Sequence, residues 1–496
     1  MGIVIRQSFW SSIFLFLGVV LGALNVLVLF KQVLGDELFG LTRILLSFSF
    51  IGAEFAMLGS PTMLIKYFPF FKEEKKKGII LFAFCIASIG IILVSLMLIL
   101  FKEDFISAKE GDAELISGYY FISIIALIGV AFYKFFQAYF KALLDTVIPV
   151  FLNDFMLRLY VTLWLLAYQY LSIPLYEWML GFGLLYLINP LLMTVILFYR
   201  KKIDFSWNKR IDNAFRKEAI SYGFWNLMAG ASMSIVNSID ILMLGWLLMK
   251  AEEQVAVYSR ALYIAALIII PLRAIGNIVQ PLVANMFKEE NYEGLIRIYK
   301  QSSINQLIVS GLVFVLIWIN IEEIFWILGD DASIAKWVVF FIGLSKVFSV
   351  ATGVNGIIIN HSKYFKFTTY FIVVLAILTV LFNQLLIPKY QLLGAAIATS
   401  FALFSFNFLK WLFVWIRLKM QPFDLNSLKV LITGIITVLI CNFIPHFFEV
   451  DLIGELSTIV LRSLVATILF ISVILAFNLS DEVKGIYKSI SNKFLP

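Results

Sequence analysis

The chain has 496 residues, of which 61% are apolar and only 14% are charged, and its mean hydropathy is +0.95. A soluble domain carries about 25% charged residues, so this composition excludes an ordinary soluble protein and indicates a membrane domain. The net charge of +7 does not require a nucleic-acid partner, because a membrane protein gathers its basic residues on one side of the bilayer.

Fourteen stretches are apolar enough to form membrane-spanning helices, each of which needs about 20 mostly apolar residues. We therefore predict an all-α integral membrane protein. The first stretch lacks a small-residue cleavage site, so we expect a retained helix and not a signal peptide. The predicted spans are 8–30, 38–60, 79–101, 116–140, 147–170, 176–199, 219–249, 256–286, 301–320, 334–358, 367–387, 393–416, 429–448 and 457–478.

Lysine and arginine are unevenly distributed among the connecting segments. An even number of spans puts both termini on one side, and 25 of the 39 basic residues fall there, against 6 on the other side and 8 within spans. Because basic residues mark the cytoplasmic side, we predict a multi-pass membrane protein with both termini in the cytoplasm. The cluster "YRKKIDFSWNKR" at 199–210 also favours anionic lipid headgroups, although topology alone explains it.

The sequence of one short loop occurs twice with small changes. "FKEEKKKG" at 71–78 and "FKEENYEG" at 287–294 are separated by six predicted spans, and an even shift keeps the orientation. This spacing predicts a parallel duplication into two six-helix lobes, the architecture of transporters that rock around a central site. The predicted division is an N-lobe at 1–199, a cytoplasmic linker at 200–218, a C-lobe at 219–416, and the last two spans with a tail at 417–496.

Three segments together resemble the Wzx-type polysaccharide flippases of the MOP exporter superfamily. "NSIDILMLGWLLMKAEEQVAVYSRALYIAALIIIPLRAI" at 237–275 resembles their seventh and eighth spans, with an Asp before a Leu-Gly and a Tyr that opens the next helix. "LLGAAIATSFALFSFNFLKWLFV" at 392–414 resembles the twelfth span, and "LGDELFGLTRILLSFS" at 34–49 fits the turn between the first two. The resemblance covers the full length.

The resemblance implies a fold shared with MATE multidrug exporters and the lipid II flippase MurJ. It also implies a bacterial cytoplasmic membrane as the location and an oligosaccharide on undecaprenyl diphosphate as the substrate, but it supplies no site residues. We further expect membrane lipids and glycan polymerase or ligase machinery as partners, no nucleic acid, and a monomer.

Eleven charged residues lie in the interiors of the predicted spans, more than two residues from either end, and each has to be explained. A charge at the bilayer centre costs about 2.5–3.5 kcal/mol. Since Arg and Lys bind phosphate oxygens, the cations are candidates for contact with a diphosphate. The candidates are Arg273, Lys346, Arg158, Arg43, Arg260 and Lys134, and the remaining cations are Lys410 and Arg462; the acids are Glu54, Asp154 and Asp240.

The candidates differ in strength. Arg273 and Lys346 lie near the centres of their spans with no acid in the same span, so we favour a function for them. Arg158 follows Asp154 by four residues, so a structural ion pair on one helical face is an equal alternative. The other cations lie near span ends, from which a long side chain reaches water.

The three acids are candidates for gating or for ion coupling. Asp240 either pairs with Arg260 or Arg43 as an outer gate, or binds a coupling H⁺ or Na⁺. Glu54 is interpreted as a lone carboxyl that is either a proton carrier or a hydrogen-bonded acid. Asp154 is either the partner of Arg158 or a member of the same gating group.

The sequence shows no catalytic, cofactor or metal site. Cys85 and Cys441 both lie in spans, and His361 and His446 are predicted on opposite sides of the membrane. A MATE-like ion-coupled multidrug exporter fits less well, because a pocket for cationic drugs needs acids and the spans hold eight cations to three acids. No connector is long enough for the catalytic domain of an enzyme. A lipid II flippase, whose substrate also carries a diphosphate, is hardly separated from the favoured function.

Overall fold

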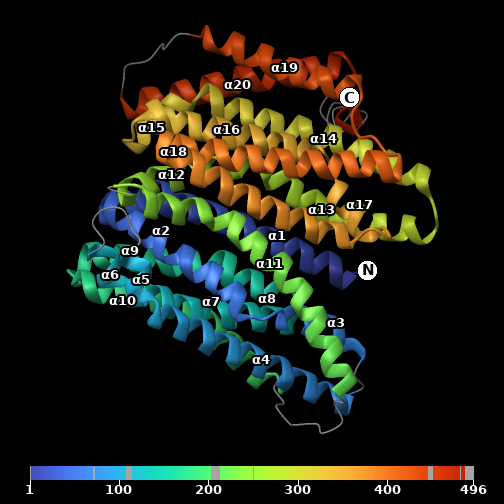
Figure 1. Ribbon diagram of the computed structural model, residues 1–496. Helices are drawn as coiled ribbons and strands as arrows, with labels where there is room; N and C mark the ends of the chain where they lie inside the picture. The colour runs from blue at the N-terminus through green and yellow to red at the C-terminus, as the bar shows by residue number, and fades with distance from the viewer. Residues whose placement is uncertain are drawn as a thin grey trace. The chain divides into compact units, whose positions relative to one another are not determined.

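A computed structural model shows a protein built from helices (Figure 1). It describes residues 2–70, 73–107, 114–202, 213–249, 251–444, 451–480 and 482–485. Within these ranges the side chains at 2–6, 8, 70, 73–77, 105, 271, 273–278 and 281 are outside the description. Most of the predicted linker and most of the first copy of the repeated loop, 71–78, therefore lie outside the described residues.

The chain divides by its internal contacts into two compact units, Met1–Ser259 and Arg260–Pro496. Helix α11 (Asn213–Leu247), which the sequence analysis placed at the start of the C-lobe, packs against α2 (Phe30–Ala56) and α3 (Ser60–Tyr67) in the first unit. This division differs from the lobes that the repeat predicts. The duplication itself stays a prediction.

The first unit is built around α7, which packs against α2 and α10, while α4 and α11 cover α2. Helix α1 packs against η3, the π-helical segment that leads into α9. The remaining elements of this unit are α1 (Gly2–Ala23), η1 (Leu24–Leu29), η2 (Phe68–Phe70), α4 (Glu73–Leu100), α5 (Lys102–Ser107), α6 (Glu114–Tyr119), α7 (Phe121–Ala142), α8 (Val147–Val150), η3 (Phe151–Met156), α9 (Leu157–Leu171), α10 (Leu175–Tyr199) and most of α12 (Ala251–Ala266).

The second unit is built around α14 and α16. Helix α16 packs against α18 and α14, and the two last helices, α19 and α20, pack against α14. Asn or Asp side chains accept backbone N–H groups at the starts of four of its helices, which fixes those starts. The elements are η4 (Leu267–Ile269), α13 (Ile270–Lys288), α14 (Tyr292–Ile319), α15 (Ile321–Leu328), α16 (Ala332–Ala351), α17 (Asn355–His361), α18 (Lys366–Leu418), α19 (Leu425–Asn442) and α20 (Leu452–Ala476).

Eleven helices in the described part of the chain are long and apolar enough to cross a membrane. Two of them, Phe9–Ala56 and Lys366–Leu418, have 48 and 53 residues, about 70–80 Å at 1.5 Å per residue, against a hydrocarbon core of about 30 Å. Each is broken inside a predicted gap between spans. The breaks are Gly35, with φ 78°, and Gln391, with φ 51°; the left-handed backbone at the first is one that glycine adopts without strain.

The predicted span at 256–286 is interrupted. Its helix is replaced by the 3₁₀ turn η4, and Pro271 lies in the first turn of α13 directly afterwards. Proline has no N–H to donate to the preceding turn, which accounts for the interruption. This segment is not among the eleven helices, and the number fourteen stays a prediction.

Candidate functional site

The Glu54 carboxylate on α2 forms an ion pair with the Lys134 ammonium group on α7. The two side chains are 23% and 29% exposed, so the pair is neither sealed in the core nor fully in solvent. Gly230 on α11 lies against it, and a Cβ at this position would collide with Glu54 Oε1. The interpretation of Glu54 as a lone carboxyl is therefore wrong, because a membrane cation from the neighbouring helix neutralises it.

Arg43, also on α2, lies among aromatic rings. Its guanidinium carbon is 5.0 Å from the centre of the Phe39 ring and 5.8 Å from that of Phe30. The two rings flank the break at Gly35 and stack at 4.7 Å. The electron-rich faces of the rings attract the guanidinium group, which helps to accommodate a cation inside a span.

Two π-helical segments of the first unit, η1 and η3, take part in hydrogen bonds of buried amide side chains. Asn25 in η1 donates from Nδ2 to the Arg158 carbonyl at 2.9 Å, and its Oδ1 accepts from Thr162 at 2.7 Å. Asn189 on α10 donates to the carbonyl of Leu152 in η3 at 3.0 Å. Such π-helical turns leave carbonyls without their α-helical partners and often occur at functional sites.

The expected ion pair between Asp154 and Arg158 is not formed. Among the residues that the structure describes, no ion pair joins the two, and the buried Nη1 atom of Arg158 has no hydrogen-bond partner. A spacing of four makes a contact possible but does not require it, and Asp154 Oδ1 instead accepts a hydrogen bond from the Asn153 amide at 3.3 Å. Nη1 lies against α1, where a Cβ on Gly18 would be 3.3 Å from it.

Asp240 on α11 accepts a hydrogen bond from the Tyr258 hydroxyl on α12, with 2.8 Å between Oη and Oδ2. Both side chains are buried, at 5% and 0% exposure. These are the Asp and the Tyr of the motif at 237–275 that carried the family resemblance. The expected pairing of Asp240 with a cation stays a prediction.

Arg260 is bound to Asp330, which lies just after α15 in the second unit. Its Nε donates to Oδ2 at 2.6 Å and its Nη2 donates to Oδ1 at 2.7 Å. The two side chains are 0% and 2% exposed. Its place near a span end predicted that the Arg260 side chain reaches water. The structure shows a buried bidentate ion pair instead.

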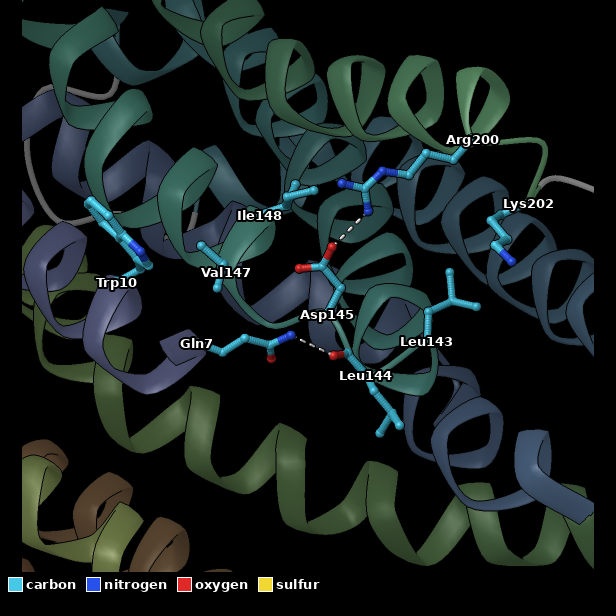
Figure 2. A pocket seen from close by; sticks show the side chains of 9 residues that line it. All are labelled: Gln7, Trp10, Leu143, Leu144, Asp145, Val147, Ile148, Arg200 and Lys202. Carbon is cyan, nitrogen blue, oxygen red and sulfur yellow. Dashed lines mark hydrogen bonds and ion pairs between the residues drawn. The ribbon is translucent and has the colours of Figure 1, made fainter. Parts of the chain in front are cut away.

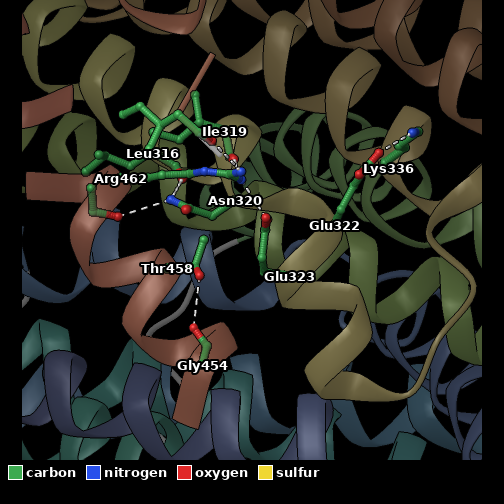
Figure 3. A network of polar contacts seen from close by, with 11 residues as sticks. Leu316, Ile319, Asn320, Glu322, Glu323, Lys336, Gly454, Thr458 and Arg462 are labelled. Carbon is green, nitrogen blue, oxygen red and sulfur yellow. Dashed lines mark hydrogen bonds and ion pairs between the residues drawn. The ribbon is translucent and has the colours of Figure 1, made fainter. Parts of the chain in front are cut away.

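Arg462 on α20 is likewise held by a buried carboxylate, in the network that Figure 3 shows. Its Nη1 donates to Glu323 at 2.5 Å and its Nη2 donates to the Ile444 carbonyl at 3.1 Å. Asn320 donates to Ser463 at 3.1 Å beside it. The network borders a pocket of about 290 Å³ and ties the last helix to α14 and α15, so the expectation that Arg462 reaches water is also wrong.

The two strongest sequence candidates remain untested. Arg273 lies in the first turns of α13, and its side chain is outside the described residues. Lys346 lies on α16 and is half-buried. Their proposed contact with a diphosphate stays a prediction.

Solved structures of membrane transporters share this architecture. The lipid II flippase MurJ in an inward closed conformation is 13% identical, with a TM-score of 0.72 over 95% of this chain and 98% of that one. The chain has the fold of the MOP superfamily. An inward-facing multidrug resistance MATE family transporter of that superfamily is 14% identical, with a TM-score of 0.62 over 80% and 94% of the two chains.

A MOP superfamily transporter from Pyrococcus furiosus, described as having a binding pocket of reverse polarity, is 15% identical, with a TM-score of 0.55 over 84% and 96%. The MatE family model matches residues 227–385. No curated protein sequence matches this chain. A MOP fold and many apolar helices together make the chain a multi-pass membrane protein.

Several residues that shape the site were missed by sequence reasoning. Asp330 and Glu323 bind cations that are 70 and 139 residues away in the sequence, and no local spacing rule connects such pairs. Asn25 gave a usable signal, because an amide inside an apolar stretch needs hydrogen-bond partners. Asn25 carries no charge, so a search among the charged residues of the spans does not find it.

Proposed function

We propose that this protein is a flippase that moves an undecaprenyl-diphosphate-linked oligosaccharide across the cytoplasmic membrane for surface polysaccharide assembly. The MOP fold supports transport by alternating access, since MurJ and MATE transporters share it. The sequence resemblance to Wzx-type flippases supports this class of substrate.

One observation carries the proposal beyond the fold. The guanidinium group of Arg158 lies inside the first unit with a buried N–H donor that no described acceptor satisfies. A buried donor of a charged group that lacks an acceptor is costly. A diphosphate oxygen is a suitable acceptor for it, because Arg binds phosphate through charge-assisted hydrogen bonds.

In the proposed mechanism the polyprenyl tail stays in lipid while the diphosphate and the sugars cross through the protein. Within the first unit, Arg158 and Lys134 are proposed to attract the diphosphate and to lower its barrier to leaving water. Within the second unit, Arg273 and Lys346 are proposed to do the same. Arg43 contributes a positive field from its aromatic surroundings. Arg260 is no longer proposed as a ligand, because Asp330 already binds it.

The coupling of transport to an ion is proposed at Glu54. When its carboxylate takes up a proton, the ion pair with Lys134 is lost and the ammonium group is released for the diphosphate. When the proton leaves, the pair forms again and the anionic substrate is displaced. Asp240, hydrogen-bonded to Tyr258, is the second candidate for H⁺ or Na⁺.

A lipid II flippase is the second candidate function. It is favoured by the similarity to MurJ, whose TM-score of 0.72 exceeds the 0.62 of the MATE transporter. Both candidates handle a polyprenyl diphosphate, so the cationic residues serve either one. The multidrug exporter has weaker support, because Arg158 repels a cationic drug.

The proposal is tested by reconstituting the protein in proteoliposomes with fluorescent undecaprenyl-diphosphate-linked oligosaccharide, lipid II or a cationic dye. We expect movement of the first substrate, and a decrease of about tenfold or more in Arg158→Ala, the loss of one charge-assisted contact. Arg158→Lys retains the charge and is expected to retain part of the activity. Lys217→Ala, on the exposed start of α11, is the matched control. Movement of the dye alone would refute the proposal, and movement of lipid II alone would select the second candidate.

We further propose that both termini are cytoplasmic, on the distribution of basic residues. Reporter fusions at Lys77 and Lys209 are expected on the cytoplasmic side, and a fusion at Asp112 is expected outside. A reversed pattern contradicts the topology without affecting the fold.

A further inference from the structure

A cavity of about 660 Å³ opens where three helix ends of the first unit meet. Gln7 and Trp10 line it from α1, Asp145 lies in the turn between α7 and α8, and Arg200 and Lys202 follow the end of α10. Figure 2 shows Arg200 reaching across the cavity toward Asp145, with Trp10 at the opposite wall. Since α7 and α10 are long and apolar enough to cross a membrane, we expect their ends, and this cavity, at a boundary between membrane and water.

The walls of the cavity are fixed by hydrogen bonds. The Tyr139 hydroxyl on α7 donates to the Lys202 carbonyl at 2.5 Å, which ties the end of α10 to α7. Gln7 donates to the Leu144 carbonyl at 3.0 Å and accepts from Thr146 at 3.2 Å, which ties α1 to the same turn. The cavity is therefore a built feature of the three helix ends and not a gap between loops.

The charges in the cavity suit an anion. Arg200 Nη1 donates to Asp145 Oδ2 at 2.8 Å, and this contact orients a guanidinium group whose side chain remains 47% exposed. The remaining N–H groups of Arg200 are available to a second acceptor, and Lys202 adds a second cation. Two cations against one carboxylate leave a net positive site with the fork geometry that binds phosphate.

The remaining wall is apolar. Trp10 is 46% exposed, and Trp is enriched at membrane interfaces, where its ring meets both chain and headgroup. Val147 and Ile148 of α8 line the cavity beside it. A ligand with a phosphate at one end and a hydrocarbon chain at the other matches both sides of the site.

We propose that this cavity binds the phosphate headgroup of an anionic lipid. Two sources supply this chemistry, a phospholipid such as phosphatidylglycerol and a polyprenyl diphosphate. The site is separate from Arg158 and from the Glu54–Lys134 pair, and it does not depend on the proposed function. Its test therefore measures binding and not transport.

Lys201 provides a matched control. It stands between Arg200 and Lys202 in the same turn and is exposed, but it does not line the cavity. Its backbone is left-handed, with φ 52°, and replacement by Ala leaves the Cβ and therefore this strain unchanged. A diffuse attraction to a negative membrane surface weakens equally when Lys201 or Lys202 is replaced, whereas a bound headgroup responds to Lys202 alone.

The experiment is native mass spectrometry of the full chain released from nanodiscs, titrated with phosphatidylglycerol, with phosphatidylcholine as the lipid without net charge, and separately with undecaprenyl diphosphate. We expect Arg200→Ala and Lys202→Ala each to reduce affinity for one of the anionic lipids about tenfold, and Lys201→Ala to reduce it less than twofold. Asp145→Asn is expected to bind at least as well as the wild type, because it removes a negative charge from the site.

The outcomes are distinct. If Arg200→Ala and Lys202→Ala lose affinity for phosphatidylglycerol, the cavity is a phospholipid site. If they lose affinity for undecaprenyl diphosphate alone, it is a loading site for a polyprenyl carrier. Both results support the proposal. Equal losses in Lys201→Ala and Lys202→Ala overturn it, since diffuse attraction then accounts for the binding. It is also overturned if Asp145→Asn weakens binding as much as Arg200→Ala, or if no variant differs from the wild type.

Discussion

The two units hold their membrane cations differently. In the second unit, Arg260 and Arg462 are bound by carboxylates that are 2% and 3% exposed. In the first unit, Lys134 and Glu54 form a pair whose side chains are 29% and 23% exposed, and no described ion pair holds Arg158. Fully buried ion pairs fix a structure, while half-exposed or unsatisfied cations can exchange partners. A count of charged residues in the spans therefore does not tell which of them are held in buried ion pairs and which can contact a substrate.

The largest expected effect comes from breaking a buried pair in the second unit. Arg260→Ala leaves the Asp330 carboxylate buried without its main counter-charge, and we expect a loss of about 3–5 kcal/mol in stability. The measurement is thermal or denaturant unfolding in detergent. The double variant Arg260→Met with Asp330→Leu replaces the pair by apolar side chains and is expected to recover most of the loss. If Arg260→Ala is as stable as the wild type, the pair is not a structural lock and the comparison fails.

The next largest effect concerns transport. Arg273→Ala and Lys346→Ala are each expected to reduce movement of the lipid-linked glycan about tenfold or more, because each removes a proposed contact with the diphosphate. Replacement by Glu is expected to abolish it by repulsion. Membrane levels are expected to remain normal, since removal of a charge from a span favours insertion.

Lys336 serves as the control for this pair of variants. It lies on α16, as Lys346 does, but it pairs with Glu322 at 2.7 Å, and that carboxylate is 68% exposed. Lys336→Ala is expected to transport normally. Normal transport by both Arg273→Ala and Lys346→Ala would show that the second unit holds only structural cations, which would sharpen the comparison and remove these residues from the proposed site.

A smaller effect is expected at the half-exposed pair of the first unit. Gly230→Ala places a methyl group where Glu54 Oε1 lies, so the carboxylate has to shift relative to Lys134. We expect a severalfold decrease in transport driven by a proton gradient, with little change in passive exchange of substrate. Glu54→Gln is expected to abolish the response to the gradient and to retain exchange. A gradient response that survives in Glu54→Gln assigns the coupling elsewhere, with Asp240 as the next residue to examine.

The sequence predicted the helices well and the partners of their charges poorly. Hydropathy is a local signal: it predicted the all-helical class, and the breaks at Gly35 and Gln391 fall in predicted gaps between spans. Partners such as Asp330 for Arg260 are set by packing between distant helices, which no local spacing reveals. The failed pair of Asp154 and Arg158 has another cause, because a spacing of four residues permits a contact without fixing it, and Asp154 accepts from Asn153 instead.

The smallest expected effect separates two neighbouring acids. Asp330 is buried on Arg260, whereas Asp331 caps α16 in solvent, where its Oδ1 accepts from the Ser333 N–H at 2.8 Å and its Oδ2 accepts from the Ser333 hydroxyl at 2.7 Å. These hydrogen bonds hold the pKa of Asp331 below its usual value. A depressed pKa means that the folded state favours the charged form, so the contribution to stability is present above the unfolded-state pKa and is lost as the pH falls through the folded one.

We therefore expect Asp331→Ala to lower the melting temperature slightly at neutral pH, by loss of the cap, and far less than Asp330→Ala does. The difference between Asp331→Ala and the wild type should shrink as the pH falls below the usual carboxyl range, because the wild-type cap is then protonated. The measurement is unfolding of both proteins across this range in the same detergent. If Asp330→Ala and Asp331→Ala destabilise the protein equally at neutral pH, the buried Arg260–Asp330 pair contributes no more to stability than a surface helix cap. The contrast between the two units then fails at the ion pair that defines it best.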